Sequence, residues 1–136
     1  MNSHYNQNYT KVQIEIILKT IQDCVKSNNY SISINNNRNE NREFKNEYNL
    51  TNERQKDILL KIKTDDFCHS LKNTNVGFEH EILYVFCPQM ILLNSEAIEE
   101  MVDIYIKFNI INYQDGKQVV VISFHKRNKP IRYLFR

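Results

Sequence analysis

The chain has 136 residues, enough for one domain with one hydrophobic core, and 41% of them are apolar. Its 18 Lys and Arg nearly balance 16 Asp and Glu, so the net charge is +2 and any basic patch must come from local segregation of charge. The sequence contains no apolar run of roughly 18 residues that could cross a bilayer, and "MNSHYNQNYTK" lacks the apolar core of a signal peptide. We therefore expect a single cytoplasmic domain over residues 1–136, with residues 1–9 frayed.

The first third of the chain predicts a helix, a strand and a second helix. Apolar residues recur at helical spacing after Thr10, a good N-cap, and predict a helix over 10–27. "NNYSISI" alternates as a short strand at 30–34. A polar loop at 35–41 then leads into a short helix around 41–48. Its cations, Arg38, Arg42 and Lys45, are interpreted as a solvated face, with phosphate contact as the minority alternative.

Two further helices are predicted before the chain changes to strands. Thr51 caps a helix at 52–62, and Thr64 begins a short helix through "DDFCHSL". In that short helix Phe67 and Leu71 would point inward, while His69 and Lys72 would share a wetter side.

The second half of the chain reads mainly as strands. "FEHEILYVF" at 78–86 predicts a strand ended by Cys87-Pro88. Residues 89–101 are ambiguous and are interpreted as a strand edge followed by an acidic loop or helical turn. "VDIYIKFNII" and "KQVVVISFH" are two strong strands joined by "NYQDG", a hairpin signal.

The hairpin's register follows from its polar and apolar faces. A loop of three residues, Gln114 to Gly116 with Gly116 in the left-handed region, pairs Tyr105 with His125 and Ile106 with Phe124. Strict alternation then separates Val120, Ile122 and Phe124 from Val121, Ser123 and His125. The register predicts one polar patch in the middle of a sheet, made of Tyr105, Lys107, Ser123 and His125.

The three cysteines, Cys24, Cys68 and Cys87, are odd in number and form no C-x-x-C pair. We interpret them as reduced thiols inside the core. Their spacing to the four His does not match the common zinc patterns, so we expect no metal site and no cofactor.

Four stretches, "DDFCHS", "EHEILYVF", "VDIYIKFNI" and "VVVISFH", resemble the MqsR toxin family of type II toxin–antitoxin systems. The resemblance covers roughly residues 40–135. It implies an α+β fold of RelE-like type, with an antiparallel sheet packed against N-terminal helices. It also implies a metal-independent endoribonuclease that cleaves mRNA and is neutralised by an antitoxin protein.

Site residues carry over only where the motifs match. His69 stands where the family has a Lys, Glu81 lies near a family Gln, and Tyr105 matches a family Tyr followed here by Lys107. His125 stands where the family has its terminal Lys. Two lysine positions have therefore become histidine in this chain.

Metal-free RNA cleavage needs a base, an acid and cations around the developing phosphorane charge. On this hypothesis His125 or Glu81 is the base and His69 or His125 the acid, because His titrates near neutral pH. Tyr105 would contact the phosphate or stack on a base. Lys107, Lys126 and Arg127 would stabilise the developing charge, and Ser123, Lys126 and Arg127 would contact the RNA. Arg127 shares the face of His125, and Lys126 lies on the opposite one.

A second functional class remains open. The same scaffold could belong to a non-catalytic binding or inhibitor protein of a phage or mobile element, with a protein as its target. The altered lysine positions fit this alternative as well as the first.

Overall fold

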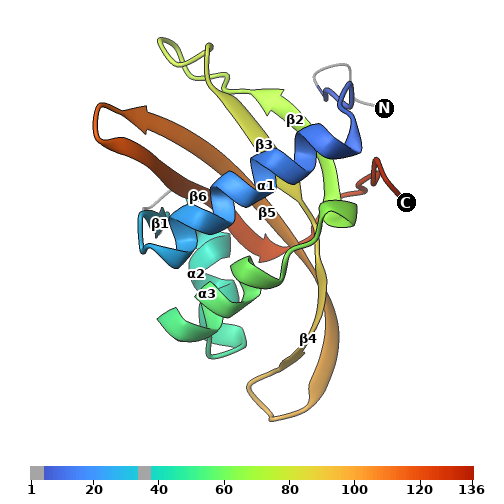
Figure 1. Ribbon diagram of the computed structural model, residues 1–136. Helices are drawn as coiled ribbons and strands as arrows, with labels where there is room; N and C mark the ends of the chain where they lie inside the picture. The colour runs from blue at the N-terminus through green and yellow to red at the C-terminus, as the bar shows by residue number, and fades with distance from the viewer. Residues whose placement is uncertain (1–4, 34–37) are drawn as a thin grey trace.

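The computed structural model describes residues 5–33 and 38–136, which form a mixed α+β domain with three α-helices and a six-stranded sheet (Figure 1). The helices are α1 (Lys11–Lys26), α2 (Asn39–Glu47) and α3 (Asn52–Lys61), and a 3-10 turn, η1 (Thr64–Asp66), follows α3. The strands are β1 (Tyr30–Ile32), β2 (Phe67–Lys72), β3 (Ile82–Phe86), β4 (Gln89–Leu93), β5 (Glu99–Tyr113) and β6 (Gly116–Lys126).

The strand order is β1-β6-β5-β3-β2, and β4 pairs with the first part of β5. Neighbouring strands are antiparallel except for β1, which runs parallel to β6. The expected α+β class is thereby confirmed, and the sheet is antiparallel apart from that one edge strand. The β4–β5 hairpin extends away from the rest of the domain (Figure 1).

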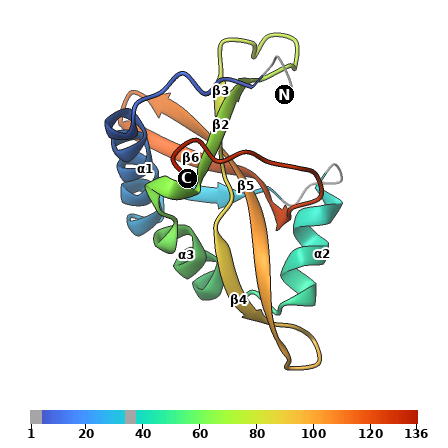
Figure 2. The ribbon, with the colours of Figure 1, turned by 90° about the vertical axis from the view of Figure 1, so that its right-hand side faces the viewer.

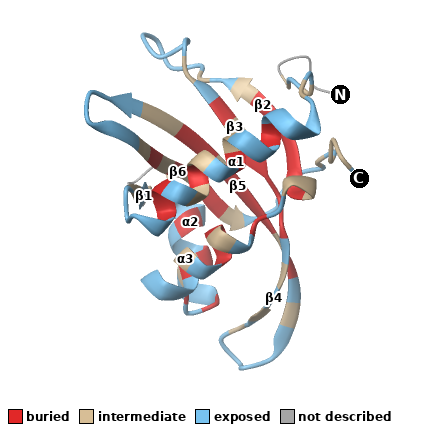
Figure 3. Cartoon of the chain, viewed as in Figure 1, coloured by how far each residue is buried: buried red, intermediate tan, exposed pale blue. Residues whose placement is uncertain are grey.

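One face of the sheet packs on the helices and forms the core. The predicted cap is present: the Thr10 hydroxyl accepts from Gln13 N, and the Gln13 side chain accepts from Thr10 N. Helix α1 buries Ile14, Ile21 and Val25 against this face, and Figure 3 shows buried residues running through the middle strands. Helices α1 and α3 lie on this side, whereas α2 lies by the edge of β6 (Figure 2).

The prediction of a helix after Thr64 is wrong. Only the 3-10 turn η1 forms there, and Phe67–Lys72 is strand β2, paired with β3. The Asp66 carboxylate accepts from Lys63 N and closes the turn, after which sheet hydrogen bonds replace helical ones. Phe67 belongs to the helix-side core and Cys68 packs with residues of the opposite face, and a bulge between Phe67 and His69 leaves Cys68 without a partner on β3.

Several predicted boundaries also shift. Residues 78–81 form a turn, so β3 begins at Ile82, and β5 begins at Glu99 within the ambiguous acidic stretch. Helix α2 begins at Asn39, inside the expected polar loop, whose residues 35–37 lie outside the described residues. Residues 5–9, expected to be frayed, contact β2: Asn6 bridges Ser70, and the Tyr9 hydroxyl lies 2.6 Å from the Ser70 hydroxyl.

The predicted hairpin register is confirmed at the patch, with Tyr105 opposite His125 and Ile106 opposite Phe124. Gly116 has the expected positive φ, 138°. The loop itself differs: Tyr113 pairs with Gly116 across a two-residue turn, and a bulge after Lys107 restores the register.

The bulge leaves Ile122 without a strand partner, since Lys107 pairs with Ser123 and Phe108 with Val121. The predicted alternation in β6 is therefore wrong at three residues, Val120, Val121 and Ile122. Val121 lies on the helix side with Phe124, and Val120 and Ile122 line the opposite face. An extra residue in one strand inverts the alternation beyond it.

Within the described residues, we find no helix of the length and apolarity required to cross a membrane.

Candidate nucleic-acid interface

The sheet face turned away from the core helices carries the polar patch. Tyr105 and His125 stack across β5 and β6, with ring centroids 5.4 Å apart and 19° between the ring planes. Next to them Lys107 pairs with Ser123, which is buried. The four residues that the sequence grouped together therefore do meet on one face.

His125 is more enclosed than expected for a strand end. Its side chain is only 12% exposed. Its Nδ1 lies 2.7 Å from the Lys126 carbonyl oxygen, and since a carbonyl only accepts, Nδ1 is the donor. Nε2 is thus the nitrogen left to exchange a proton.

Lys107 lies partly buried near the centre of this face. Burial, then the positive charges of Arg38 and Lys129, lower the pKa of its ammonium group. Cations from the residue before α2 and from the C-terminal segment therefore act on Lys107 from outside its own strand. A lysine in such surroundings favours an anionic ligand, because the ligand offsets both the burial and the repulsion.

Two adjoining cavities open beside Lys107, and we call them together the basic groove. The first has a volume of about 510 Å³ and contains Tyr5, Lys72, Tyr105, Lys107 and Lys129 in its wall. The second, of about 420 Å³, continues past Lys72 and Lys107 to Arg38, over Leu83, Val120 and Ile122. Lys129 also lies over the Tyr105 ring, 5.0 Å from its centroid.

The groove's cations differ from the other cations near it in having no acidic partner. Within residues 5–33 and 38–136, no carboxylate lies at ion-pair distance from Arg38, Lys72, Lys107 or Lys129. By contrast, Lys126 pairs with Glu47 at 2.7 Å and Arg127 with Asp103 at 3.2 Å. The two cations expected to hold RNA are therefore paired with carboxylates, whereas the four cations of the groove are not, within the described residues.

Lys126 lies on the predicted opposite face. Its ammonium group is 5.1 Å from the centroid of the Tyr48 ring, on the helix side. The hydrogen bond to Glu47, followed by Tyr48, raises its pKa. Arg127 donates to Asp103 and to the Lys129 carbonyl, and so orders the start of the C-terminal segment.

His69 does not lie where the sequence suggested. It is 2% exposed on β2, and β3 and β5 separate it from β6. Three strand spacings are roughly 14 Å, too far for His69 and His125 to share a proton through one water. Burial, then the charges of Lys129 and Lys107, lower the pKa of His69 to about 4, so its ring is neutral at pH 7.

Glu81 also stands apart from Tyr105 and His125. It follows the turn before β3, and its carboxylate accepts from the Asn73 amide at 2.9 Å. It lines the second cavity of the groove, where Lys107 also appears. The structure thus brings Glu81 to the groove but not to the Tyr105–His125 pair.

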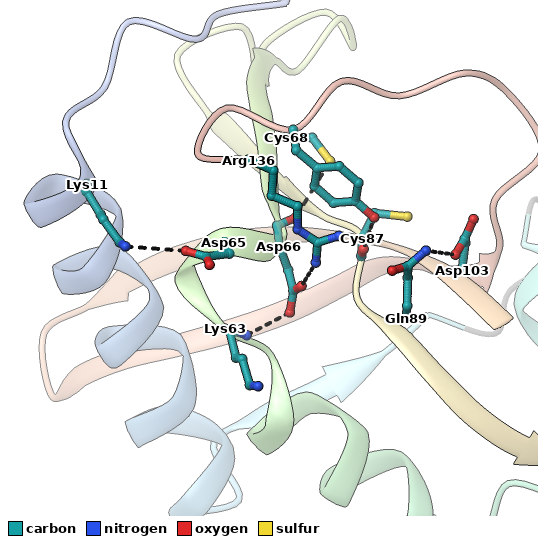
Figure 4. Close-up of polar contacts among 10 residues, drawn as sticks. Lys11, Lys63, Asp65, Asp66, Cys68, Cys87, Gln89, Asp103 and Arg136 are labelled. Carbon is teal, nitrogen blue, oxygen red and sulfur yellow. Dashed lines mark hydrogen bonds and ion pairs between the residues drawn. The ribbon is translucent and has the colours of Figure 1, made fainter. Parts of the chain in front are cut away.

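The C-terminal segment, residues 127–136, crosses this face from the end of β6 to β2 (Figure 2). Its far end is anchored at η1, where Arg136 donates to the buried Asp66 at 2.6 Å (Figure 4). The Tyr133 hydroxyl donates to the Cys87 carbonyl, and Leu134 N donates to the Phe67 carbonyl. These contacts place Lys129 over the groove.

The sequence pattern did not indicate Tyr5 or Lys129 as site residues. It placed Arg38 on a solvated face and Lys72 on the wetter side of a helix. All four reach the groove through tertiary contacts: Asn6 pairing with β2 positions Tyr5, and the crossing C-terminal segment positions Lys129. A lysine flanked by Asn128 and Pro130 carries no local signal of this placement.

The cysteines are buried and free, as expected of core thiols. Burial raises the pKa of Cys68 and raises that of Cys87 to about 11. Among the described residues, no three His, Cys, Asp or Glu side chains are grouped so as to hold a metal ion.

Comparison with known proteins found no matching family model, curated protein or solved structure.

Proposed function

We propose that the protein binds single-stranded RNA in the basic groove and cleaves it without a metal ion. The observation that carries the proposal is Lys107, which is partly buried, lacks a carboxylate partner in the described chain and lies between the cations Arg38 and Lys129. Such a site favours a phosphate. The Tyr5 ring in the wall of the groove favours a single strand, whose unpaired bases can stack on an aromatic ring.

The groove also supplies a set of groups for phosphodiester chemistry. Lys107 and Lys129 would hold the phosphate and its developing charge, and Tyr105 would donate a hydrogen bond to it, because burial keeps its pKa high. His125 Nε2 would exchange the proton at the 2′-hydroxyl or the departing 5′-oxygen. Lys107, whose pKa is lowered, would be the second proton carrier in place of His69.

The resemblance to MqsR toxins supports the same proposal. Tyr105 and His125, two of the residues matched to that family, are direct cross-strand neighbours. We accordingly propose a RelE-like toxin fold, mRNA as the substrate and an antitoxin protein as the neutralising partner.

A second candidate is a binding or inhibitor protein without catalysis. The observation in its favour is the position of His69, which is buried two strands away from Lys107 and leaves one fewer proton carrier at the groove. In this case the groove would bind RNA or an acidic protein and leave it intact.

The test is incubation of the purified protein with a long single-stranded RNA in EDTA. We expect cleavage that leaves 2′,3′-cyclic phosphate and 5′-hydroxyl ends, lost in Lys107→Met and kept in the control His80→Ala, whose histidine is exposed outside the groove. Binding without cleavage would favour the second candidate. If the protein neither binds nor cleaves the RNA, the proposal is refuted.

A further inference from the structure

A second aromatic stack lies beside the basic groove. The rings of Tyr5 and His69 are nearly parallel, with centroids 3.7 Å apart and 10° between their planes. Tyr5 is held there by the N-terminal segment: Asn6 bridges Ser70, and the Gln7 amide donates to the carbonyls of Cys68 and Arg132. The separation and tilt are those of stacked planar groups.

The stack borders a cavity of about 250 Å³. Its wall comes from the N-terminal segment, strand β2 and the C-terminal segment, and consists of Tyr5, Gln7, His69, Pro130, Ile131 and Arg132. Tyr5 also lines the first cavity of the basic groove, so one ring separates the two spaces. Aromatic rings and a proline provide flat apolar walls, and Gln7 and Arg132 provide polar groups at the edge.

His69 Nε2 has no hydrogen-bond partner among the described residues. It is buried, and no described residue lies at hydrogen-bonding distance from it; it is the one buried side-chain nitrogen or oxygen of the described chain in this position. Buried polar atoms nearly always have a partner, and a bare one weakens a fold unless a ligand satisfies it. Because the ring is neutral, Nε2 can pair with a neutral donor or acceptor.

We propose that this cavity is a nucleobase subsite for the RNA strand held in the basic groove. A base enters between Tyr5 and residues 130–132, Tyr5 shifts, the base stacks on an aromatic ring, and its edge bonds His69 Nε2. The sugar–phosphate then lies on the other side of Tyr5, against Lys129 and Lys107. The choice of RNA as the ligand rests on the proposed function, but the cavity and its unpaired nitrogen do not.

The direct test uses uncharged ribonucleosides, which need no phosphate site. Adenosine, guanosine, cytidine and uridine are titrated separately into the full chain, and the ring signals of His69 and Tyr5 are followed by NMR. We expect at least one nucleoside to shift the signals of the His69 and Tyr5 rings, both in wild type and in Lys107→Met. The same nucleoside should leave the signals of the His80 ring unchanged. In His69→Phe it should also leave the signals of the Tyr5 ring unchanged. No shift with any nucleoside at millimolar concentration would overturn the subsite.

A second measurement uses RNA of one length with and without a single abasic position. Loss of the base should weaken binding by about tenfold in wild type, as for a stacked base, and by much less in His69→Phe. Equal losses in wild type and His69→Phe would also overturn the subsite. If nucleosides bind but RNA does not, the subsite stands and the proposed function fails. If RNA binds but no nucleoside shifts the two rings, the proposed function stands and the subsite fails.

Discussion

Tyr105 and His125 face each other across β5 and β6 because a bulge at Ile122 corrects the register set by the hairpin turn. The bulge is held by Asn41 of α2. Its amide nitrogen donates to the Ile122 and Ser33 carbonyls at 2.9 Å, and its oxygen accepts from Phe124 N at 2.8 Å. A helix at the sheet edge therefore fixes the pairing of the two residues on the opposite face.

Asn41→Ala should destabilise the protein strongly. The substitution leaves three backbone groups at the bulge without this partner, and each buried group costs roughly 1–3 kcal/mol. We expect a loss of at least about 2 kcal/mol in the free energy of unfolding, measured in urea, with a changed environment at Tyr105 by NMR. Asn46→Ala, an exposed asparagine of the same helix, is the control and should change stability by less than about 0.5 kcal/mol. Similar losses in both variants would refute the role of Asn41.

His69 should make the fold sensitive to acid. Its folded-state pKa is about 4, below the ordinary 6.5, so between these values the unfolded chain binds more protons. The free energy of unfolding then falls as pH drops from about 6.5 to 4, by on the order of 3 kcal/mol from this group. His69→Phe should remove that part of the decrease, and urea unfolding at pH 7 and pH 4.5 measures it. His80→Phe should keep the wild-type decrease; an unchanged decrease in His69→Phe would contradict the account.

Asp66 should matter far more than its neighbour Asp65. Asp66 is buried and accepts from both Lys63 N and Arg136, so Asp66→Ala should cost roughly 2 kcal/mol and free the end of the C-terminal segment. Asp65 is half-exposed, and its carboxylate lies 3.4 Å from the Lys11 ammonium group. Asp65→Ala is the matched control and should lower the free energy of unfolding by less than about 1 kcal/mol. Thermal unfolding compares the two, and the NMR signal of Lys129 reports whether the segment still crosses the groove. Equal costs would refute the anchor.

The sequence predicted the elements whose signals are local and missed those that depend on pairing. Thr10 and Thr51 cap their helices as expected, because capping uses residues three positions apart. "DDFCHSL" carries helix-start signals, yet strand β3 supplies hydrogen bonds that only the folded sheet offers.

The candidate site divides in the same way. Tyr105, Lys107, Ser123 and His125 could be grouped from alternation across one hairpin. The bulge that inverts Val121 depends on Asn41, eighty residues earlier in the chain, and could not be predicted from the hairpin alone. Tyr5 and Lys129 reach the face on segments without regular secondary structure, which periodicity does not describe.

The central claim is that Lys107 holds an RNA phosphate, and the salt dependence of RNA binding tests it most directly. Lys107→Met keeps the aliphatic stem and removes one charge. Lys61→Met removes the same charge from the surface of α3, where Lys61 pairs with Asp57. With a single-stranded oligonucleotide, we expect Lys107→Met to bind about tenfold more weakly and its log–log salt slope to shrink by about 0.7, the value for one phosphate contact. Lys61→Met should match wild type in both. Equal affinity and slope in all three proteins would contradict the account.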